Sequence, residues 1–162
     1  MSAAPALDRA RLLLARGKAD EALRAADEAL VHEPHHLGAL LFKAALRLES
    51  REGEEALRLC DQAVAAWPRS SEAWNGLARC RHALGNDAGG LLAAEEARHL
   101  LGEGDNSRQA APVFVWCLRE MGKYREALDV AEEGLARIPD AILAQWAATL
   151  EEELAEAEKE GC

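Results

Sequence analysis

The chain has 162 residues, which suits a single domain with its own core, and 49% of them are hydrophobic. Its net charge of −10 repels phosphate backbones and anionic lipid surfaces, so we expect neither a nucleic-acid partner nor a membrane partner. Ala, Leu, Glu and Arg dominate while aromatic residues make up only 4%, which favours helices over sheets and predicts an all-α fold.

The first helix is predicted over residues 6–16, where charged residues interrupt the leucines. Asp8, Arg9 and Arg11 break the apolar run that a secretory signal or a membrane span would need. We therefore expect a cytoplasmic protein, in which four cysteines without a CxxC pair stay reduced. Three of these are interpreted as small core residues: Cys60, Cys80 and Cys117.

The apolar pattern predicts four helix pairs followed by a single last helix. These nine helices span residues 6–16, 20–32, 36–50, 54–66, 71–84, 88–101, 110–121, 124–137 and 140–158. Gly17, Gly85 and Gly122 fall where first helices of a pair should end. Asp20 and Asp87 are candidates to cap the second helices that follow.

The third pair is the irregular one. Gly89 and Gly90 lie inside its predicted second helix, where each glycine costs roughly 1 kcal/mol. Residues 102–107 then hold a short insertion before the fourth pair. We interpret the two features together as a looser joint that the surface tolerates.

The last helix has one apolar face and one glutamate-rich face. Its apolar face carries Leu143, Trp146, Leu150, Leu154 and Ala157 at steps of three and four residues. We interpret this helix as a cap that packs on the fourth pair and presents acidic side chains to solvent.

Small residues recur with a period of 34 to 37 residues along the chain. One such column contains Ala22, Ala56, Gly90 and Ala127. Another column closes each unit with Pro34, Pro68, Gly102 and Pro139. Alanines at these positions allow two antiparallel helices to cross closely, and each short pair must stack on the next to bury its apolar face.

This repeat resembles the tetratricopeptide family, whose pattern reads W-x2-L-G-x2-Y, then A-x3-F, then a closing proline. The best matches are EAWNGLARCRHALGN (72–86) and GKYREALDVAEEGLARIP (122–139). The resemblance implies a right-handed α-solenoid of about four helix-turn-helix repeats in one domain, residues 1–162. The repeats would span about 3–36, 37–70, 71–104 and 108–141, with the capping helix at about 140–158.

The resemblance also implies a ligand-binding groove lined by the first helices. Mapping the family's groove positions onto this chain predicts ten peptide-binding residues: Leu7, Arg11, Leu14, Leu41, Leu48, Asn75, Arg79, His82, Trp116 and Arg119. A Trp and an Arg in a concave surface are residue types that binding hot spots favour. The alternative for Trp116 is packing against the next helix.

We therefore predict a non-enzymatic scaffold or adaptor, a monomer or weak homodimer, that binds a protein or peptide with apolar anchors and acidic residues. A dedicated chaperone of a secreted client is one alternative, since GLARCRHALG and APVFVWCLREMGKYREA resemble type III secretion translocator chaperones. A structural subunit of an assembly is another. The carboxylate-clamp subtype is disfavoured because its Lys and Asn columns hold Leu7, Arg11, Phe42 and Gly76.

No catalytic, cofactor or metal site is predicted. His32, His35 and His36 lie together on an inter-repeat turn, but no distant residue with metal-ligand spacing accompanies them. The motifs GxGxxG, GxxxxGK[ST], HExxH and GxSxG do not occur. The sequence therefore argues against an enzyme.

Overall fold

The computed structural model describes residues 2–101, 110–137 and 140–161, and these residues form nine α-helices and no strand. The helices are α1 (Ala4–Ala15), α2 (Ala19–His32), α3 (Leu37–Glu49), α4 (Gly53–Ala66), α5 (Ser71–Ala83), α6 (Asp87–Leu101), α7 (Ala110–Glu120), α8 (Tyr124–Arg137) and α9 (Ala141–Glu160). Every helix end lies within two residues of its predicted position, and the all-α fold is confirmed. The predicted insertion at 102–107 lies outside the described residues.

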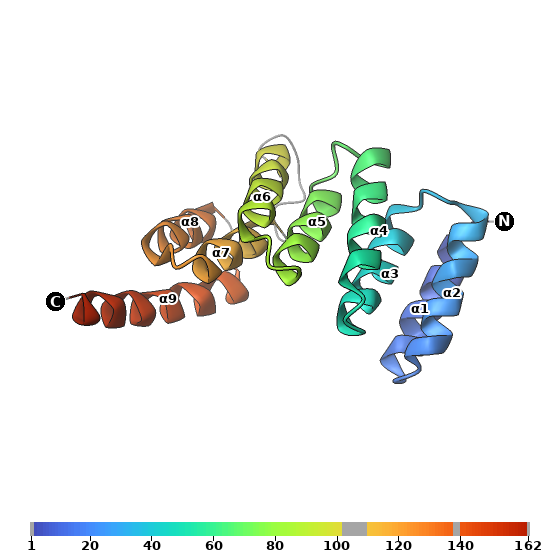
Figure 1. Cartoon of the computed structure of the whole chain (residues 1–162), viewed down its shortest axis with the longest axis horizontal. Helices are drawn as coiled ribbons and strands as arrows, with labels where there is room; N and C mark the ends of the chain where they lie inside the picture. The colour runs from blue at the N-terminus through green and yellow to red at the C-terminus, as the bar shows by residue number, and fades with distance from the viewer. Residues whose placement is uncertain (1, 102–109, 138–139, 162) are drawn as a thin grey trace.

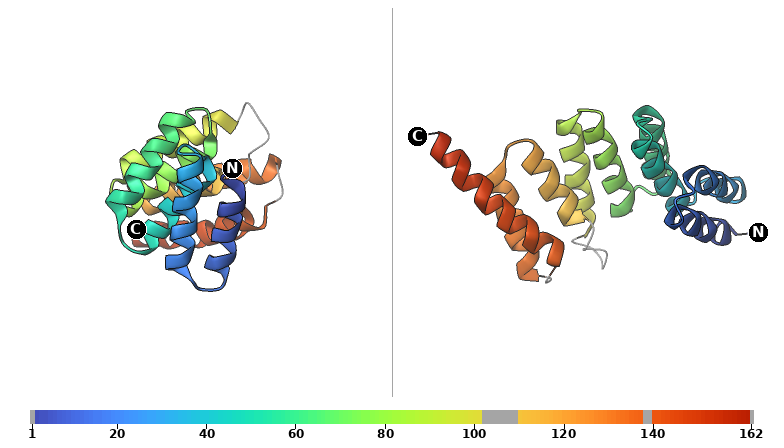
Figure 2. Two further views of the ribbon diagram at one scale, coloured as in Figure 1. Left: turned by 90° about the vertical axis from the view of Figure 1, so that its right-hand side faces the viewer. Right: turned by 90° about the horizontal axis from the view of Figure 1, so that it is seen from below.

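Successive helices pack side by side in pairs, and the pairs follow one another along an elongated molecule with the two termini at opposite ends (Figure 1). The view from below shows the same succession of pairs (Figure 2). Beyond chain neighbours, α3 contacts α5, α5 contacts α7, and α7 contacts α9. The helices α3, α5, α7 and α9 thus form one row, which is part of the surface where the sequence predicts a groove.

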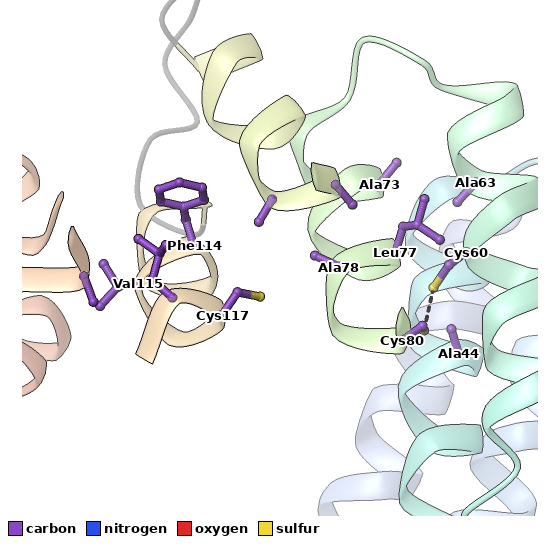
Figure 3. Packing of buried hydrophobic residues seen from close by; sticks show 14 of the residues in the cluster. Ala44, Cys60, Ala63, Ala73, Leu77, Ala78, Cys80, Phe114, Val115 and Cys117 are labelled. Atoms are coloured by element: carbon purple, nitrogen blue, oxygen red, sulfur yellow. Dashed lines mark hydrogen bonds between the residues drawn. The ribbon is translucent and has the colours of Figure 1, made fainter. Parts of the chain in front are cut away.

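Small residues occupy the crossings between helices. Ala29, Ala63, Ala78 and Ala97 are completely buried, and their size allows the helix axes to approach within roughly 8–10 Å. Figure 3 shows Ala63 and Ala78 beside Leu77, one of the largest side chains that are fully buried. The repeating small-residue columns therefore set how closely the pairs stack.

The core is continuous from α3 to α9, whereas the first pair is packed differently. Leu40, Leu77 and Leu150 are large buried members of the continuous core. The buried residues of α1 and α2 instead form two small clusters, one around Leu7 and one around Ala10. Phe42 of α3 packs against both of these clusters.

Glycine ends three of the four first helices. Gly17, Gly85 and Gly122 have φ angles of +75°, +78° and +71°, in the left-handed region that glycine enters without steric cost. Arg51 occupies the same corner of the second repeat with φ of +60°, where a Cβ costs roughly 1–2 kcal/mol. All four corners keep the same pair of backbone hydrogen bonds, so the fold imposes this conformation on Arg51.

The prediction that Asp20 and Asp87 cap the second helices is wrong. Asp20 lies in the first turn of α2, and no side chain caps that helix. At α6, the N–H of Gly89 donates to Oδ1 of Asn86 at 2.9 Å, so the cap lies one residue earlier than predicted. The carboxylate of Asp87 instead contacts His82.

Gly90, one of the two glycines of the predicted looser joint, lies at a close contact between helices. Gly90 is buried, and a Cβ there would lie 3.1 Å from the carbonyl oxygen of Ala78 and 3.4 Å from the backbone nitrogen of His82. The missing side chain therefore lets α6 lie directly against α5. Gly90 therefore allows the close approach of α5 and α6, and it does not loosen their packing.

The last helix packs on α8 and α7 and reaches Glu160. Leu143, Ala147 and Leu150 are buried in the continuous core. Asp140 begins the helix, because its Oδ1 accepts from the backbone N–H of Ile142 at 2.8 Å. These contacts support the interpretation of α9 as a cap on the fourth pair.

We predict that Arg51→Gly raises the free energy of unfolding by about 0.5–1 kcal/mol. Glycine removes the left-handed strain, and its greater freedom in the unfolded chain offsets part of that gain. Urea unfolding followed by circular dichroism measures the change. Gly85→Ala is the matched control and should lose about 1 kcal/mol, since a Cβ there meets no neighbour and only the backbone strain changes. A less stable Arg51→Gly variant would contradict the prediction.

We also predict that a chain ending at Asp140 associates into oligomers or aggregates. Removal of α9 exposes the apolar surface that Leu143, Ala147 and Leu150 cover in the intact chain. Light scattering at increasing protein concentration measures the association, with the full chain as reference. A truncated chain that stayed monomeric and equally stable would show that α9 is not a cap.

Candidate functional site

A cavity of about 460 Å³ lies between α3 and α5, on the row formed by the first helices. Leu41 and Leu48 of α3 line one side, and Asn75 and Arg79 of α5 line the other. Two residues of later helices complete the wall: Pro112 and Ile142. Four of the ten residues predicted to bind a peptide therefore lie together around one cavity.

Gly76 shapes the floor of this cavity. A Cβ at Gly76 would lie 2.6 Å from Cδ2 of Leu41, which is closer than two carbons can approach, and 3.5 Å from Sγ of Cys60. The bare backbone lets the Leu41 side chain lie flat against α5. Sequence reasoning used Gly76 only against a carboxylate clamp and missed this role.

Asn75 is the unusual side chain of the cavity. Its exposed fraction is only 6%, and neither its amide nitrogen nor its carbonyl oxygen has a hydrogen-bond partner among the described residues. A buried polar group left unpaired costs roughly 1–3 kcal/mol. An amide with a free donor and a free acceptor at a cavity wall is the arrangement expected where a ligand supplies the missing partners.

Arg79 gives the cavity a positive charge at its rim. The side chain is exposed, and no described carboxylate forms a salt bridge with it. Glu72, also exposed, lies two turns earlier on the same helix and lines the cavity too. The rim is thus polarised along α5, from an acidic residue to a basic one.

His82 and Trp116 lie against each other at the contact between α5 and α7. Their ring centroids are 4.0 Å apart in an edge-to-face arrangement with 71° between the planes. Nδ1 of His82 is also 2.5 Å from Oδ1 of Asp87. Trp116 is half-buried against the continuous core. Both side chains therefore have partners within the protein, as the packing alternative for Trp116 proposed.

Arg119 pairs with Glu153 of α9. Nε of Arg119 donates to both carboxylate oxygens of Glu153, at 2.8 and 3.0 Å. Accepting these hydrogen bonds lowers the pKa of Glu153, and the same bonds raise the pKa of Arg119. The guanidinium thus links α7 to α9 and lies outside the cavity.

The three predicted residues of the first repeat lie apart from the cavity. Leu7 is buried in a small cluster, where its Cδ2 fills the space beside Gly38. Arg11 is exposed, and its guanidinium is 3.6 Å from Asp8. Leu14 is half-buried on α1. The structure therefore divides the predicted groove into a cavity at α3 and α5 and flanking residues that have other contacts.

Sequence reasoning missed two residue pairs at the cavity. Cys60 and Cys80 were correctly interpreted as buried, but nothing in the sequence indicated that both border the cavity. Pro112 and Ile142 reach it from the fourth repeat and the last helix. Their approach depends on how the stack curves, which no local pattern specifies.

Of the clustered histidines His32, His35 and His36, one has a structural role. Nδ1 of His36 accepts the N–H of Ala39 at 3.2 Å and caps α3. His32 and His35 are exposed. Among the described residues, no three His, Cys, Asp or Glu side chains are placed to share a metal ion. None of the described helices has the length and apolar character needed to cross a membrane.

A model of the tetratricopeptide repeat family matches residues 7–71 and, in a second match, residues 43–111. The two matches overlap and together cover more than half of the chain. Among curated proteins, no sequence matches at a significant level.

Solved structures share the fold at low sequence identity. TTC0263, a thermophilic TPR protein of Thermus thermophilus, superposes with a TM-score of 0.81 and 20% identity over 94% of this chain and 83% of its own. YrrB, a TPR protein with an unusual peptide-binding site, gives a TM-score of 0.63 and 21% identity over 98% and 80%. A mutant O-GlcNAc transferase of Thermobaculum terrenum gives 0.70 and 22% over 83% of this chain but 26% of the enzyme.

We predict that Glu153→Gln lowers the free energy of unfolding at pH 7 by about 0.5–1 kcal/mol. The folded pKa of Glu153 lies below its unfolded value, so its contribution is present above the ordinary Glu range and disappears as the pH falls through the lowered pKa. The free energies of unfolding of variant and wild type should therefore become equal at acidic pH. Urea unfolding at neutral and acidic pH measures both. Glu158→Gln, at the exposed pair with Arg125, is the control and should have a smaller effect. A pH-independent difference would contradict the assignment.

Proposed function

Because the chain belongs to the tetratricopeptide repeat family, we propose that it is a non-enzymatic scaffold that holds a segment of another protein in the cavity between α3 and α5. Tetratricopeptide proteins are in general protein-interaction scaffolds. The one enzyme among the similar structures named above is matched over only 26% of its length. The bound segment is proposed to be extended, with an apolar side chain and an acidic residue.

The unpaired amide of Asn75 is the observation that carries this proposal. Its donor and acceptor are both buried and both lack partners within the described part of the chain. An extended peptide offers a backbone N–H and a backbone C=O, so one residue of the segment satisfies both ends of the amide. Stability alone gives no reason to keep a polar side chain there, because an apolar residue of the same size would avoid the desolvation cost.

The walls of the cavity suit the side chains of such a segment. Leu41 and Leu48 provide an apolar surface for one hydrophobic anchor. Arg79 at the rim has no acidic partner among the described residues and is free to pair with a carboxylate of the ligand. Glu72 would repel the same carboxylate, so the segment is proposed to place its acidic residue toward Arg79 and away from Glu72.

The proposal places Leu41, Leu48, Asn75 and Arg79 at the centre of the binding surface. The other six predicted residues lie outside this cavity, and binding there would require the ligand to extend along the row of first helices. The chaperone and structural-subunit alternatives, the cytoplasmic location and the oligomeric state stay predictions from the sequence.

We predict that Asn75→Leu separates stability from binding. The variant should raise the free energy of unfolding by about 1–3 kcal/mol, since it removes two unpaired buried polar atoms. It should also weaken a peptide selected from a random 12-residue display library against the wild type by about tenfold or more. Isothermal titration measures the affinity, and urea unfolding measures the stability.

Arg79→Ala should weaken the same peptide by roughly 1–3 kcal/mol and leave the stability nearly unchanged, because the side chain is exposed. Arg58→Ala is the matched control, since Arg58 is an exposed arginine of α4 that does not line the cavity. Unchanged affinity in both Asn75→Leu and Arg79→Ala would place the binding surface elsewhere. A destabilised Asn75→Leu variant would show that the amide has a partner within the protein.

A further inference from the structure

Two cysteine side chains face each other beneath the cavity. Sγ of Cys60, on α4, is 3.0 Å from Sγ of Cys80, on α5 (Figure 3). Each residue has an exposed fraction of only 1%. The contact joins the second repeat to the third, because α4 closes one and α5 opens the next.

The cavity borders this pair. Both Cys60 and Cys80 line the cavity of about 460 Å³, although almost no surface of either residue is exposed to bulk solvent. Gly76 adds no side chain over Cys60, so its sulfur lies next to bare backbone on α5. Hydrogen peroxide, which is little larger than water, fits within a cavity of this volume, whereas a protein thiol does not.

We propose that Cys60 and Cys80 form a dithiol site that hydrogen peroxide converts, reversibly on reduction, into a disulfide joining the second and third repeats. A disulfide requires the two sulfur atoms to approach to about 2.05 Å, so the pair has to close by roughly 1 Å. The two side chains already point toward each other across one helix contact (Figure 3).

The environment distinguishes the two sulfurs. The hydrogen bond between the two sulfurs lowers the pKa of the Cys80 thiol, and the nearby Arg79 guanidinium lowers it further, against the opposing effect of burial. The same hydrogen bond, together with burial, raises the pKa of Cys60. Cys80, which adjoins Arg79 on α5, is therefore assigned as the sulfur that attacks peroxide, and Cys60 as the resolving thiol.

The chemistry balances in two steps. The Cys80 thiolate attacks one oxygen of peroxide, the O–O bond breaks, and the departing hydroxide takes up a proton to become water. The Cys60 sulfur then attacks the resulting sulfenic acid, the S–O bond breaks, and a second water leaves with the Cys60 proton. The two thiols lose two electrons in total and peroxide gains them. A dithiol reductant reverses the change by thiol–disulfide exchange.

Cys117 provides a comparison within the same core. It is buried like the pair, but burial raises its pKa to about 11 and no described sulfur bonds to it. Its thiol should therefore stay reduced under conditions that oxidise the pair. The prediction concerns two of four cysteines and not thiols in general.

The experiment treats the full chain carrying Cys162→Ser with a small molar excess of hydrogen peroxide, followed by denaturation, alkylation and digestion with trypsin. Trypsin releases Cys60 within residues 59–69 and Cys80 within residues 80–81. Mass spectrometry should find these two peptides joined with the loss of two hydrogens, and Cys117 alkylated. Dithiothreitol should restore three alkylated cysteines.

Oxidation should also raise the melting temperature by roughly 5–10 °C, because the bond closes a loop of about 20 residues and constrains the unfolded chain. The rise should be lost on reduction and absent in Cys60→Ala and Cys80→Ala, but kept in Cys117→Ala. Trapping with dimedone should label Cys80 in Cys60→Ala more strongly than Cys60 in Cys80→Ala, because Arg79 adjoins Cys80 in the chain. The test uses no peptide ligand, so its outcome is independent of the proposed binding function.

Three results would overturn the proposal. In the first, Cys60 and Cys80 remain fully alkylatable after treatment with peroxide. In the second, the cross-link joins two molecules instead of residues 59–69 and 80–81 of one chain. In the third, Cys117 would be oxidised as readily as Cys60 and Cys80, which would show that proximity and access confer no selectivity.

Discussion

The close approach of helices at small residues is the constraint on which the rest of the structure depends. Each pair has too little apolar surface to be stable alone, so the pairs must stack, and alanines such as Ala63 and Ala78 set the distance between them. Gly90 extends the same rule to α6, where a Cβ would lie 3.1 Å from a backbone oxygen of α5, a tighter contact than most Cβ atoms make. The cavity between α3 and α5 is the place where this stacking stays incomplete.

That incompleteness explains why the proposed binding site combines an apolar surface with a costly polar group. Leu41 packs against the continuous core, and Leu41 and Asn75 both line the cavity. The unpaired amide is tolerated because the stack contributes stability that is independent of it. The same geometry leaves Cys60 and Cys80 at the boundary between the core and the cavity.

The sequence predicted the helices well because their signals are local: a period in small residues, glycines at corners and an apolar face every three or four residues. The column mapping also selected Asn75 and Arg79, which share a cavity. Contacts between side chains of different repeats could not be predicted from the sequence, because they depend on the curvature of the stack. The pairing of Arg119 with Glu153 and the contact of Trp116 with His82 are of this kind. Gly90 was misjudged because helix propensity says nothing about what approaches a residue from outside.

The core is divided between the first helix pair and the rest of the chain. The first pair is held by small clusters at Leu7 and Ala10, whereas the segment from α3 onward shares one continuous apolar interior. In a linear array, each repeat opens at the cost of its own interfaces, so we expect α1 and α2 to open more easily than the pairs that share the continuous core. Amide protons of that pair would then exchange with solvent earliest while the walls of the cavity stay closed. The walls of the cavity therefore belong to the continuous part of the core, and the first pair lies outside it.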